Sequence, residues 1–367
     1  MKTSTSKSQT AKAVIGKPDR ATPRLTKAKA GRLLAPPLQG PSGAPPEVEV
    51  IALPGNAAFQ KAWQVLVEEA VDDNPFFSPR FLVPAAVHLA PDAPMTLVAI
   101  WQATSSGRKL TGLVPMTAPR RPVLSSLING GHAGLWVHSL LPFSAPLLSP
   151  DRDSAVASVA AFLDWMMARK QRLSTLSLPF LLRGSVACTM LEQELARHGF
   201  EIECRNDLPH TRGLDFKPSS LPVGIEKVLV ARQAGTVRDA LEHALCLDMQ
   251  RTETDNAHQP ILLDINRAAF LRAVVRGFAI EGRMVIVTID DGMLSASAMV
   301  IEGRDSGFLW WIMGKDASNP LVESLLGAAA ERMIGKPMVA ASVEPLSGLW
   351  SSPIFTQTLL VHLGRSA

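Results

Sequence analysis

Apolar residues recur at helical spacing after the first fifty-five positions of the chain. The pattern predicts an amphipathic helix over residues 56–71. Ser78-Pro79 supplies an N-cap and a proline at the first helical position, so a second helix is expected from there to about His88. Two apolar runs, 95–101 and 110–116, are joined by small and polar turn residues and predict an antiparallel hairpin.

The alternation of apolar runs and turn residues continues to position 206. Gly199 marks the end of a helix, because glycine adopts the left-handed conformation that terminates helices. The further elements expected here are a strand near 135–139, a helix over 153–170, a strand at 175–178, a helix over 185–198 and a strand at 200–204.

A second series of elements follows position 207. Thr236-x-x-Asp239 resembles a capping box and predicts a helix that starts there and reaches about Met249. Asp291-Gly292, between two apolar runs, is a strong hairpin signal. The other elements expected are a helix over 266–281 that ends at Gly282, hairpin strands at 284–290 and 293–301, a strand at 307–313, a helix from Pro320 to Gly335, and strands at 338–342 and 354–362.

Both series follow the order helix, helix, hairpin, strand, helix, strand. The fold class expected is therefore α/β (α+β), with a duplicated architecture in which each domain is a mixed, mostly antiparallel sheet flanked by helices. We place the N-terminal domain at residues 47–206 and the C-terminal domain at 207–367. No repeat at the level of single residues accompanies the duplication.

The charge of the chain is unevenly distributed. The 367 residues carry a formal net charge of +4, but residues 1–32 alone hold nine Lys or Arg against one acid, a charge of +8. The rest of the chain therefore carries −4. Residues 1–46 combine this basic segment with the Pro/Gly-rich stretch 35–46 and are expected to be a disordered tail and linker. Apart from non-specific contacts of the tail, nucleic acid is not an expected partner.

The sequence argues against several classes of protein. No apolar run reaches the roughly 18 residues that a membrane span needs, and no signal segment is recognisable, so a cytoplasmic protein is expected. Cys188, Cys204 and Cys246 are scattered and are expected to be reduced thiols. The absence of C-x-x-C and H-E-x-x-H argues against a metal site. The absence of nucleotide-binding glycine motifs and of G-x-S-x-G argues against dinucleotide, P-loop and serine hydrolase chemistry.

A candidate anion site lies where the strand at 307–313 leads through a turn into the helix that begins at Asn319-Pro320. The first N–H groups of a helix lack intrahelical partners and, with the helix dipole, attract anions such as a pyrophosphate. Lys315 adds a positive charge nearby. An ordinary capped helix is the alternative interpretation.

Two tryptophans, Trp310 and Trp311, precede this turn on the same strand. Neighbouring residues of a strand face opposite sides, so one ring is expected in the core while the other could face a cleft. Core packing of both rings is the alternative.

Several segments resemble one protein family. They are residues 59–89 (FQKAWQVLVEEAVDDNPFFSPRFLVPAAVHL), 107–116 (GRKLTGLVPM), 144–148 (SAPLL) and 270–301 (FLRAVVRGFAIEGRMVIVTIDDGMLSASAMVI). Together they resemble the cellulose-biosynthesis-associated (CelD-type) acetyltransferases of the GNAT superfamily. The likeness covers most of residues 50–335, and its most specific piece is Asn74-Pro75-Phe76-Phe77-Ser78-Pro79.

The resemblance implies two tandem GNAT-like domains, with an acyl-CoA co-substrate in the C-terminal one. In such transferases the acceptor amine attacks the thioester carbonyl directly, and backbone N–H groups of the third strand polarise that carbonyl. The implied substrate contacts are Trp310 and Trp311. The implied cofactor-binding residues are Met313, Gly314, Lys315, Ser318, Asn319, Leu321 and Val322.

The chain departs from the family at several positions. A Trp-Lys-Gly segment is replaced near Met249-Gln250-Arg251-Thr252, the Asp and Lys expected after the last helix are missing around 347–350, and the chain contains no tyrosine to protonate a departing thiolate. Asp248 and Glu253 remain as candidate general bases, with surface charges as the alternative.

Two functions stay open on the sequence. The first is an acyl-CoA-dependent N- or O-acyltransferase that acts on a small-molecule or saccharide acceptor, in particular in envelope polysaccharide biosynthesis. The second is a catalytically degenerate GNAT-like fold that acts as an interaction or accessory protein.

Overall fold

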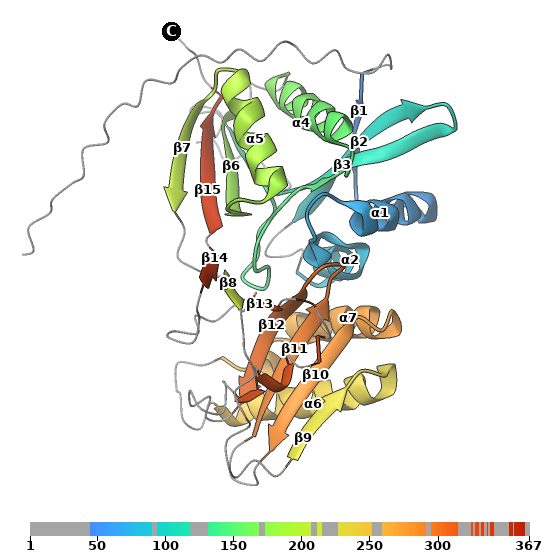
Figure 1. Cartoon of the computed structure of the whole chain (residues 1–367), viewed down its shortest axis with the longest axis vertical. Coiled ribbons are helices and arrows are strands. Elements are labelled where there is room, and N and C mark those ends of the chain that lie inside the picture. The colour runs from blue at the N-terminus through green and yellow to red at the C-terminus, as the bar shows by residue number, and fades with distance from the viewer. Residues whose placement is uncertain are drawn as a thin grey trace, which may run out of the picture. The chain divides into compact units, whose positions relative to one another are not determined.

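The structure is a computed structural model of the whole chain, and most of the chain between residues 45 and 363 is described (Figure 1). All described residues belong to the unit Pro41–Ala367. Of the tail and linker expected at 1–46, only Pro45 and Pro46 lie within the description. The described residues are 45–89, 94–117, 131–168, 173–206, 211–214, 227–251, 259–290, 295–314, 324–325, 327–329, 332–333, 336, 338–340, 352–354 and 356–363.

The first half of the chain, up to residue 206, contains the expected helices and strands. They are β1 (Glu47–Ile51), α1 (Ala57–Glu69), the short 3₁₀ helix η1 (Pro75–Phe77), α2 (Pro79–His88), β2 (Met95–Thr104), β3 (Gly107–Thr117), β4 (Gly131–Gly134), β5 (Leu147–Leu148), α4 (Arg152–Met167), β6 (Leu173–Leu182), α5 (Val186–Arg197) and β7 (Glu201–Asn206).

The second half, from residue 211, repeats the order. Its elements are β8 (Thr211–Leu214), β9 (Lys227–Ala231), α6 (Ala234–Arg251), η2 (Ile261–Leu263), α7 (Ile265–Ile280), β10 (Met284–Asp290), β11 (Ser295–Glu302), β12 (Gly307–Gly314), β13 (Met338–Ala340), β14 (Ser352–Ile354) and β15 (Thr356–His362). Asp291-Gly292, the turn expected between β10 and β11, lies outside the description.

Several helix ends follow the capping chemistry that the sequence indicates. Ser78 lies at the N-cap of α2, as expected, but its buried hydroxyl makes no capping hydrogen bond. Asn56 accepts a hydrogen bond from the backbone N–H of Phe59 at the start of α1 (2.8 Å). Gly199 and Gly282 have φ angles of 72° and 69°, as helix-terminating glycines require. The capping box expected at Thr236 is wrong, because α6 already begins at Ala234. The Thr236 hydroxyl donates instead to the carbonyl of Gln233, so it lies inside the first turn.

One strand of the first half lies earlier than predicted. The strand expected near 135–139 is β4, at Gly131–Gly134, which pairs in parallel with β6. Only Leu135 of the predicted range takes part in pairing, through a single antiparallel bridge to Met116. The reason is a change of partner: the chain leaves β6 at this point and turns toward β3.

Both halves build mixed sheets that are mostly antiparallel. The first half has strand orders β1-β2-β3-β5 and β4-β6-β15-β7, and the second half has the order β14-β8-β13-β12-β11-β10-β9. Each half has one parallel pair, β4 with β6 and β12 with β13. Helices flank these sheets. The predicted fold class, α/β (α+β) with mixed, mostly antiparallel sheets flanked by helices, is confirmed.

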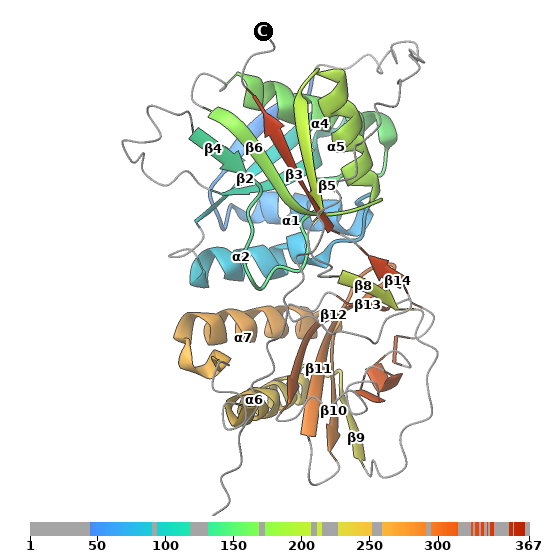
Figure 2. The same ribbon diagram turned by 90° about the vertical axis from the view of Figure 1, so that its left-hand side faces the viewer.

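The first half is completed by a strand from the end of the chain. The last strand, β15, pairs antiparallel with β6 on one side and with β7 on the other. Figures 1 and 2 show it, in red, among the green strands of the first half. A boundary between 206 and 207 therefore separates strands of one sheet, and the predicted domain limits stay a prediction. The strand β8, at the start of the second half, pairs with β13 and β14 of the same half.

A single hydrophobic core connects the two halves. It contains apolar residues of α1, α2 and the segment 140–143 together with those of α6, α7 and β10–β12. Its centre is aromatic: Phe76 makes edge-to-face contacts with Phe81, Phe143 and Phe308, with ring centroids 5.4–5.7 Å apart. The described helices include none with the length and apolarity that crossing a membrane would require.

Removing β15 tests its pairing with β6 and β7. A chain that ends at residue 355 loses the ladder partners of β6 and β7 and the buried side chains Leu359 and Val361. We expect the first half to unfold, because each large apolar side chain lost from a core costs about 2–5 kcal/mol. Hydrogen exchange should show β6 and β7 amides losing protection. A chain that ends at residue 363 keeps β15 and is the control. Unchanged protection of these amides in the shorter chain would contradict the pairing of β15 with β6 and β7.

The buried thiol of Cys188 gives a second test of how β15 is seated. Cys188 lies on α5 and its Sγ accepts a hydrogen bond from the side-chain amide of Gln357 on β15 (3.1 Å). Burial raises the pKa of Cys188 to about 12. Thiolate is the reactive form, so at pH 8 only about one molecule in 10⁴ is reactive at this position.

We therefore expect a disulfide reagent to titrate the exposed Cys204 and Cys246 in the native protein, and Cys188 only after unfolding. The variant Cys204→Ser/Cys246→Ser should show no fast-reacting thiol until denaturant is added. Rapid reaction of that variant would show that Cys188 is accessible and that β15 is not seated as described.

Candidate functional site

The candidate site strand is β12, and its two edges are paired differently. It pairs antiparallel with β11 along its whole length, from Gly307 to Gly314. Among the residues that the structure describes, its parallel pairing with β13 covers only Gly307–Leu309. The second part of β12 thus extends past the described end of β13; residues 341–350, which follow β13, lie outside the description.

A β-bulge interrupts β12 at the two tryptophans. Leu309 lies opposite Val300 and Trp311 lies opposite Met299, so Trp310 is the extra residue. Because of the extra residue, two successive side chains lie on the same face of the sheet instead of on opposite faces. Trp310 and Trp311 accordingly belong to the same core, which faces α6 and α7, while Leu309 and Ile312 belong to the core on the other face of the sheet.

The bulge corrects the expectation that the two rings face opposite sides. Trp310 is fully buried and Trp311 is 9% exposed. The indole N–H of Trp310 donates to the backbone carbonyl of Leu140, in the first half (3.1 Å). Its ring packs edge-to-face against Phe81 and Phe270, at centroid distances of 5.5 and 6.1 Å. A role of either tryptophan in substrate contact stays a prediction.

Only part of the predicted cofactor site lies within the description. Met313 and Gly314 are buried at the end of β12. A Cβ on Gly314 would lie 3.0 Å from both the Cβ of Ala296 and the carbonyl oxygen of Ser295, so β12 approaches β11 closely here. The other predicted residues are not described; these are Lys315, Ser318, Asn319, Leu321 and Val322. The following helix is described from Ser324, and Leu325 packs on the face of the sheet opposite α6 and α7.

Of the two candidate bases, Asp248 has a clear structural contact. Its side chain, on α6, is 2% exposed, and its carboxylate accepts the backbone N–H of Ile261 at the start of η2 (2.8 Å). This hydrogen bond fixes η2 against the end of α6. Glu253 lies outside the described residues. Both assignments as general base therefore stay predictions. Among the described residues, no three His, Cys, Asp or Glu side chains gather as they would in a metal site.

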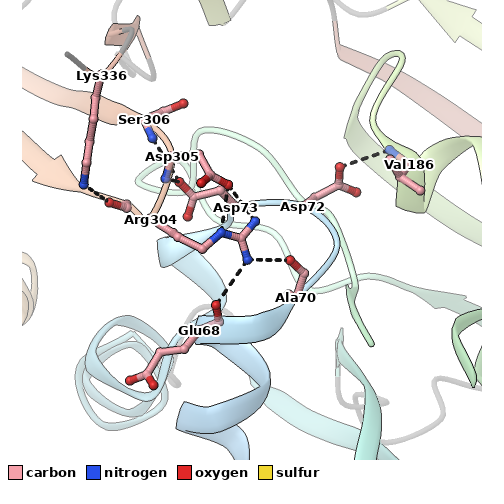
Figure 3. A network of polar contacts seen from close by, with 10 residues as sticks. Glu68, Ala70, Asp72, Asp73, Val186, Arg304, Asp305, Ser306 and Lys336 are labelled. Atoms are coloured by element: carbon pink, nitrogen blue, oxygen red, sulfur yellow. Dashed lines mark hydrogen bonds and ion pairs between the residues drawn. The ribbon is translucent and has the colours of Figure 1, made fainter. Parts of the chain in front are cut away.

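The contacts that join the halves at the start of β12 were not found from the sequence. Figure 3 shows the carboxylate of Asp73, after α1, next to the turn between β11 and β12. Its Oδ2 accepts the backbone N–H groups of Asp305 (2.8 Å) and Ser306 (3.2 Å). The guanidinium of Arg304 donates back to the carbonyl of Ala70 (2.8 Å).

Charges reinforce this junction. A hydrogen bond from Arg304 lowers the pKa of Asp305, and the same contact, followed by the charges of Asp73 and Asp72, raises the pKa of Arg304. Lys336 donates to the carbonyl of Gly303 (2.9 Å). The pair Arg304–Asp305 is largely exposed, so its contribution to stability is small. Asp73 accepts its two backbone N–H groups through charge-assisted hydrogen bonds, which are stronger than neutral ones.

The neighbouring residues make two hydrogen bonds each inside the first half. Asp72 accepts the backbone N–H groups of Val186 and Ala187 at the start of α5 (3.0 and 2.7 Å). Asn74 is 1% exposed; its amide accepts from the N–H of Phe76 and donates to the carbonyl of Ala145. The run of three polar residues was the available signal in the sequence.

No protein-family model matches the chain, and no curated protein matches it. Solved structures with GNAT folds are similar to it. A tandem GNAT protein from the clavulanic acid biosynthesis pathway is 11% identical, with a TM-score of 0.43, over 88% of this chain and 100% of that one. FemX is 8% identical, with a TM-score of 0.49, over 83% and 91%. L-PGS from Bacillus licheniformis is 11% identical, with a TM-score of 0.43, over 85% and 93%. These values are too low to bear on the site or on the activity.

The helix start of the first half that corresponds to the candidate anion site carries two carboxylates. There α4 follows β5 as the second-half helix follows β12. Asp151 caps α4, and hydrogen bonds from Ser154 lower the pKa of Asp151. Asp153 adds another carboxylate in the first turn. Ser144, just before β5, donates through its backbone N–H to the carbonyl of Phe180 on β6 (2.9 Å). Two carboxylates disfavour a phosphate at this helix start.

A substitution at Gly303 tests the junction. A Cβ there would lie 2.2 Å from Oδ2 of Asp73 and 2.6 Å from Cε2 of Phe308, so the turn must move away from the first half. We expect Gly303→Ala to lower the free energy of unfolding by about 1–3 kcal/mol, measured by denaturant titration. Gly235→Ala is the control, because nothing lies within 4 Å of the added Cβ in α6. Equal stability of both variants would contradict the junction.

Proposed function

We propose that the second half binds an acyl-CoA along β12 and transfers its acyl group to an amine or hydroxyl acceptor. The observation that supports this most is the pairing of the bulged strand β12. It pairs with β11 along its whole length, whereas among the described residues its pairing with β13 ends at Leu309. An edge with unpaired backbone N–H groups can donate to a thioester carbonyl. It then stabilises the oxyanion that forms when the acceptor attacks.

The transfer is a direct displacement. The acceptor nitrogen or oxygen forms a bond to the thioester carbon while the bond from that carbon to sulfur breaks. The acceptor loses one proton, and the released thiolate takes one up. Without tyrosine in the chain, this proton reaches the thiolate from a cysteine or from water, in the site or after the thiolate has left it. Asp248 and Glu253 are the residues proposed to take the acceptor's proton.

The co-substrate's diphosphate is assigned to the turn and helix start after β12. The proposed contacts are Met313, Gly314, Lys315, Ser318, Asn319, Leu321 and Val322, with Trp310 and Trp311 bordering the acyl end. We assign one acyl-CoA per chain, because carboxylates occupy the corresponding helix start of the first half. The CelD-type resemblance favours an envelope saccharide or its precursor as acceptor. An acyl-CoA co-substrate suits a cytoplasmic protein.

A catalytically degenerate, accessory role is the second candidate. It is favoured by the burial of both tryptophan rings and by the engagement of Asp248 with Ile261. Such a protein would keep the fold and bind other proteins of a polysaccharide-synthesis or envelope assembly.

Calorimetry with acetyl-CoA and longer acyl-CoAs distinguishes the two. We expect one site per chain and a Lys315→Ala variant that binds about tenfold more weakly, since a hydrogen bond to a charged group contributes about 1.5–3 kcal/mol. Lys61→Ala, on the exposed side of α1, is the matched control and should bind as the wild type does. No binding at millimolar ligand would overturn the proposal and favour the accessory role.

A further inference from the structure

The first half forms hydrogen bonds with the site strand β12 and the turn before it at two places. At the turn before it, the Asp73 carboxylate accepts two backbone N–H groups, of Asp305 and Ser306. At the bulge, the carbonyl of Leu140 accepts the indole N–H of Trp310. We call these two contacts the β12 clamp. Both come from segments of the first half that carry no predicted site residue.

The second contact acts on the residue that defines the bulge. Trp310 is the extra residue of β12, so its orientation decides where the backbone N–H groups of the following residues point. A buried indole N–H is costly when it lacks an acceptor. The Leu140 carbonyl therefore favours one arrangement of the bulge over others. Donors for an oxyanion must be placed within a few tenths of an ångström to be effective.

The first contact fixes the other end of the strand. Asp73 and the ring of Phe76 both come from the segment after α1, and Phe76 contacts Phe308 on β12 (ring centroids 5.7 Å apart). Gly303 leaves just enough room for the Asp73 carboxylate. The start of β12 thus cannot shift unless the first half shifts with it.

We propose that the first half, whose own helix start is capped by Asp151, serves to position the β12 bulge of the second half, with Trp310 and Asp73 as positioning residues. The proposal rests on the proposed acyl-CoA site. It assigns the first half a role in setting the polarisation of the thioester carbonyl rather than in binding a ligand of its own.

The first test compares two indole N–H groups that are equally buried and equally bonded. Trp310→Phe removes the bond to Leu140, whereas Trp63→Phe removes a bond to the carbonyl of Phe77 (2.8 Å) within the first half. Both side chains are fully buried. The readouts are the ratio of acetyl-CoA to CoA affinity and the carbonyl stretching frequency of bound ¹³C-labelled acetyl-CoA. A loss of packing alone would change neither.

We expect Trp310→Phe to lower the affinity ratio roughly three- to tenfold and to shift the carbonyl frequency toward its value in water. Trp63→Phe should lower the melting temperature and leave both readouts as in the wild type. If Trp310→Phe folds and leaves the ratio and the frequency unchanged, the positioning role is wrong.

The second test compares two neighbouring carboxylates. Asp73→Ala frees the turn of the second half, whereas Asp72→Ala frees the start of α5 in the first half; each carboxylate accepts two backbone N–H groups. Hydrogen exchange of residues 310–314 without ligand should speed up in Asp73→Ala and not in Asp72→Ala. Asp73→Asn, which keeps an accepting oxygen, should restore part of the protection.

The exchange measurement separates this proposal from the proposed function. If wild-type protein binds no acetyl-CoA, the acyl-CoA site is wrong, and the exchange of β12 still decides whether the clamp exists. If acetyl-CoA binds but neither Asp73→Ala nor Trp310→Phe alters the exchange of residues 310–314, the clamp is wrong while the site stands.

Discussion

The return of the last strand to the first half is the constraint on which the rest of the structure depends. The strand β15 lies between β6 and β7, so this sheet of the first half is complete only with the end of the chain. Backbone groups of a central strand must be paired on both sides, because buried N–H and C=O groups without partners are costly. The insertion of β15 therefore makes the folding of the first half depend on the end of the chain, although the first half contains its own helices and hairpin.

The segment after α1 adds side-chain contacts to this backbone constraint. Three successive polar residues serve three different partners: Asp72 the start of α5, Asp73 the turn before β12, and Asn74 the carbonyl of Ala145. Phe76 then fills the aromatic centre of the shared core. Because the hydrogen bonds of Asp73 are short and directional, they constrain the distance between α1 and β12. Hydrophobic burial alone, which is non-directional, would not do so.

Local chemistry explains which features the sequence could predict. Helix periodicity gave α1, α2, α4, α5 and α7 within a few residues, and glycine conformation gave the ends at Gly199 and Gly282. The bulge could not be predicted, because nothing in GFLWWIMG identifies the residue without a partner; the register with β11 decides it. The pairing of β15 with β6 and β7 could not be predicted either, because the sequence of β15 is that of an ordinary apolar strand. Of the candidate site, Lys315–Val322 stays a prediction from local sequence and resemblance, and the contacts of Asp73 and Leu140 were missed because their partners lie about 230 and 170 residues away.

The two halves share an order of elements but differ where the helix after the third strand begins. In the first half Asp151 and Asp153 occupy that helix start, whereas the second half offers Lys315, Ser318 and Asn319 at the corresponding place in its sequence. The first half supports the second through side-chain contacts. Its Asp73 carboxylate holds the turn before β12, its aromatic residues share a core with β12, and its strands β6 and β7 are the partners of β15. Retention of the first half thus follows from these contacts and requires no ligand of its own.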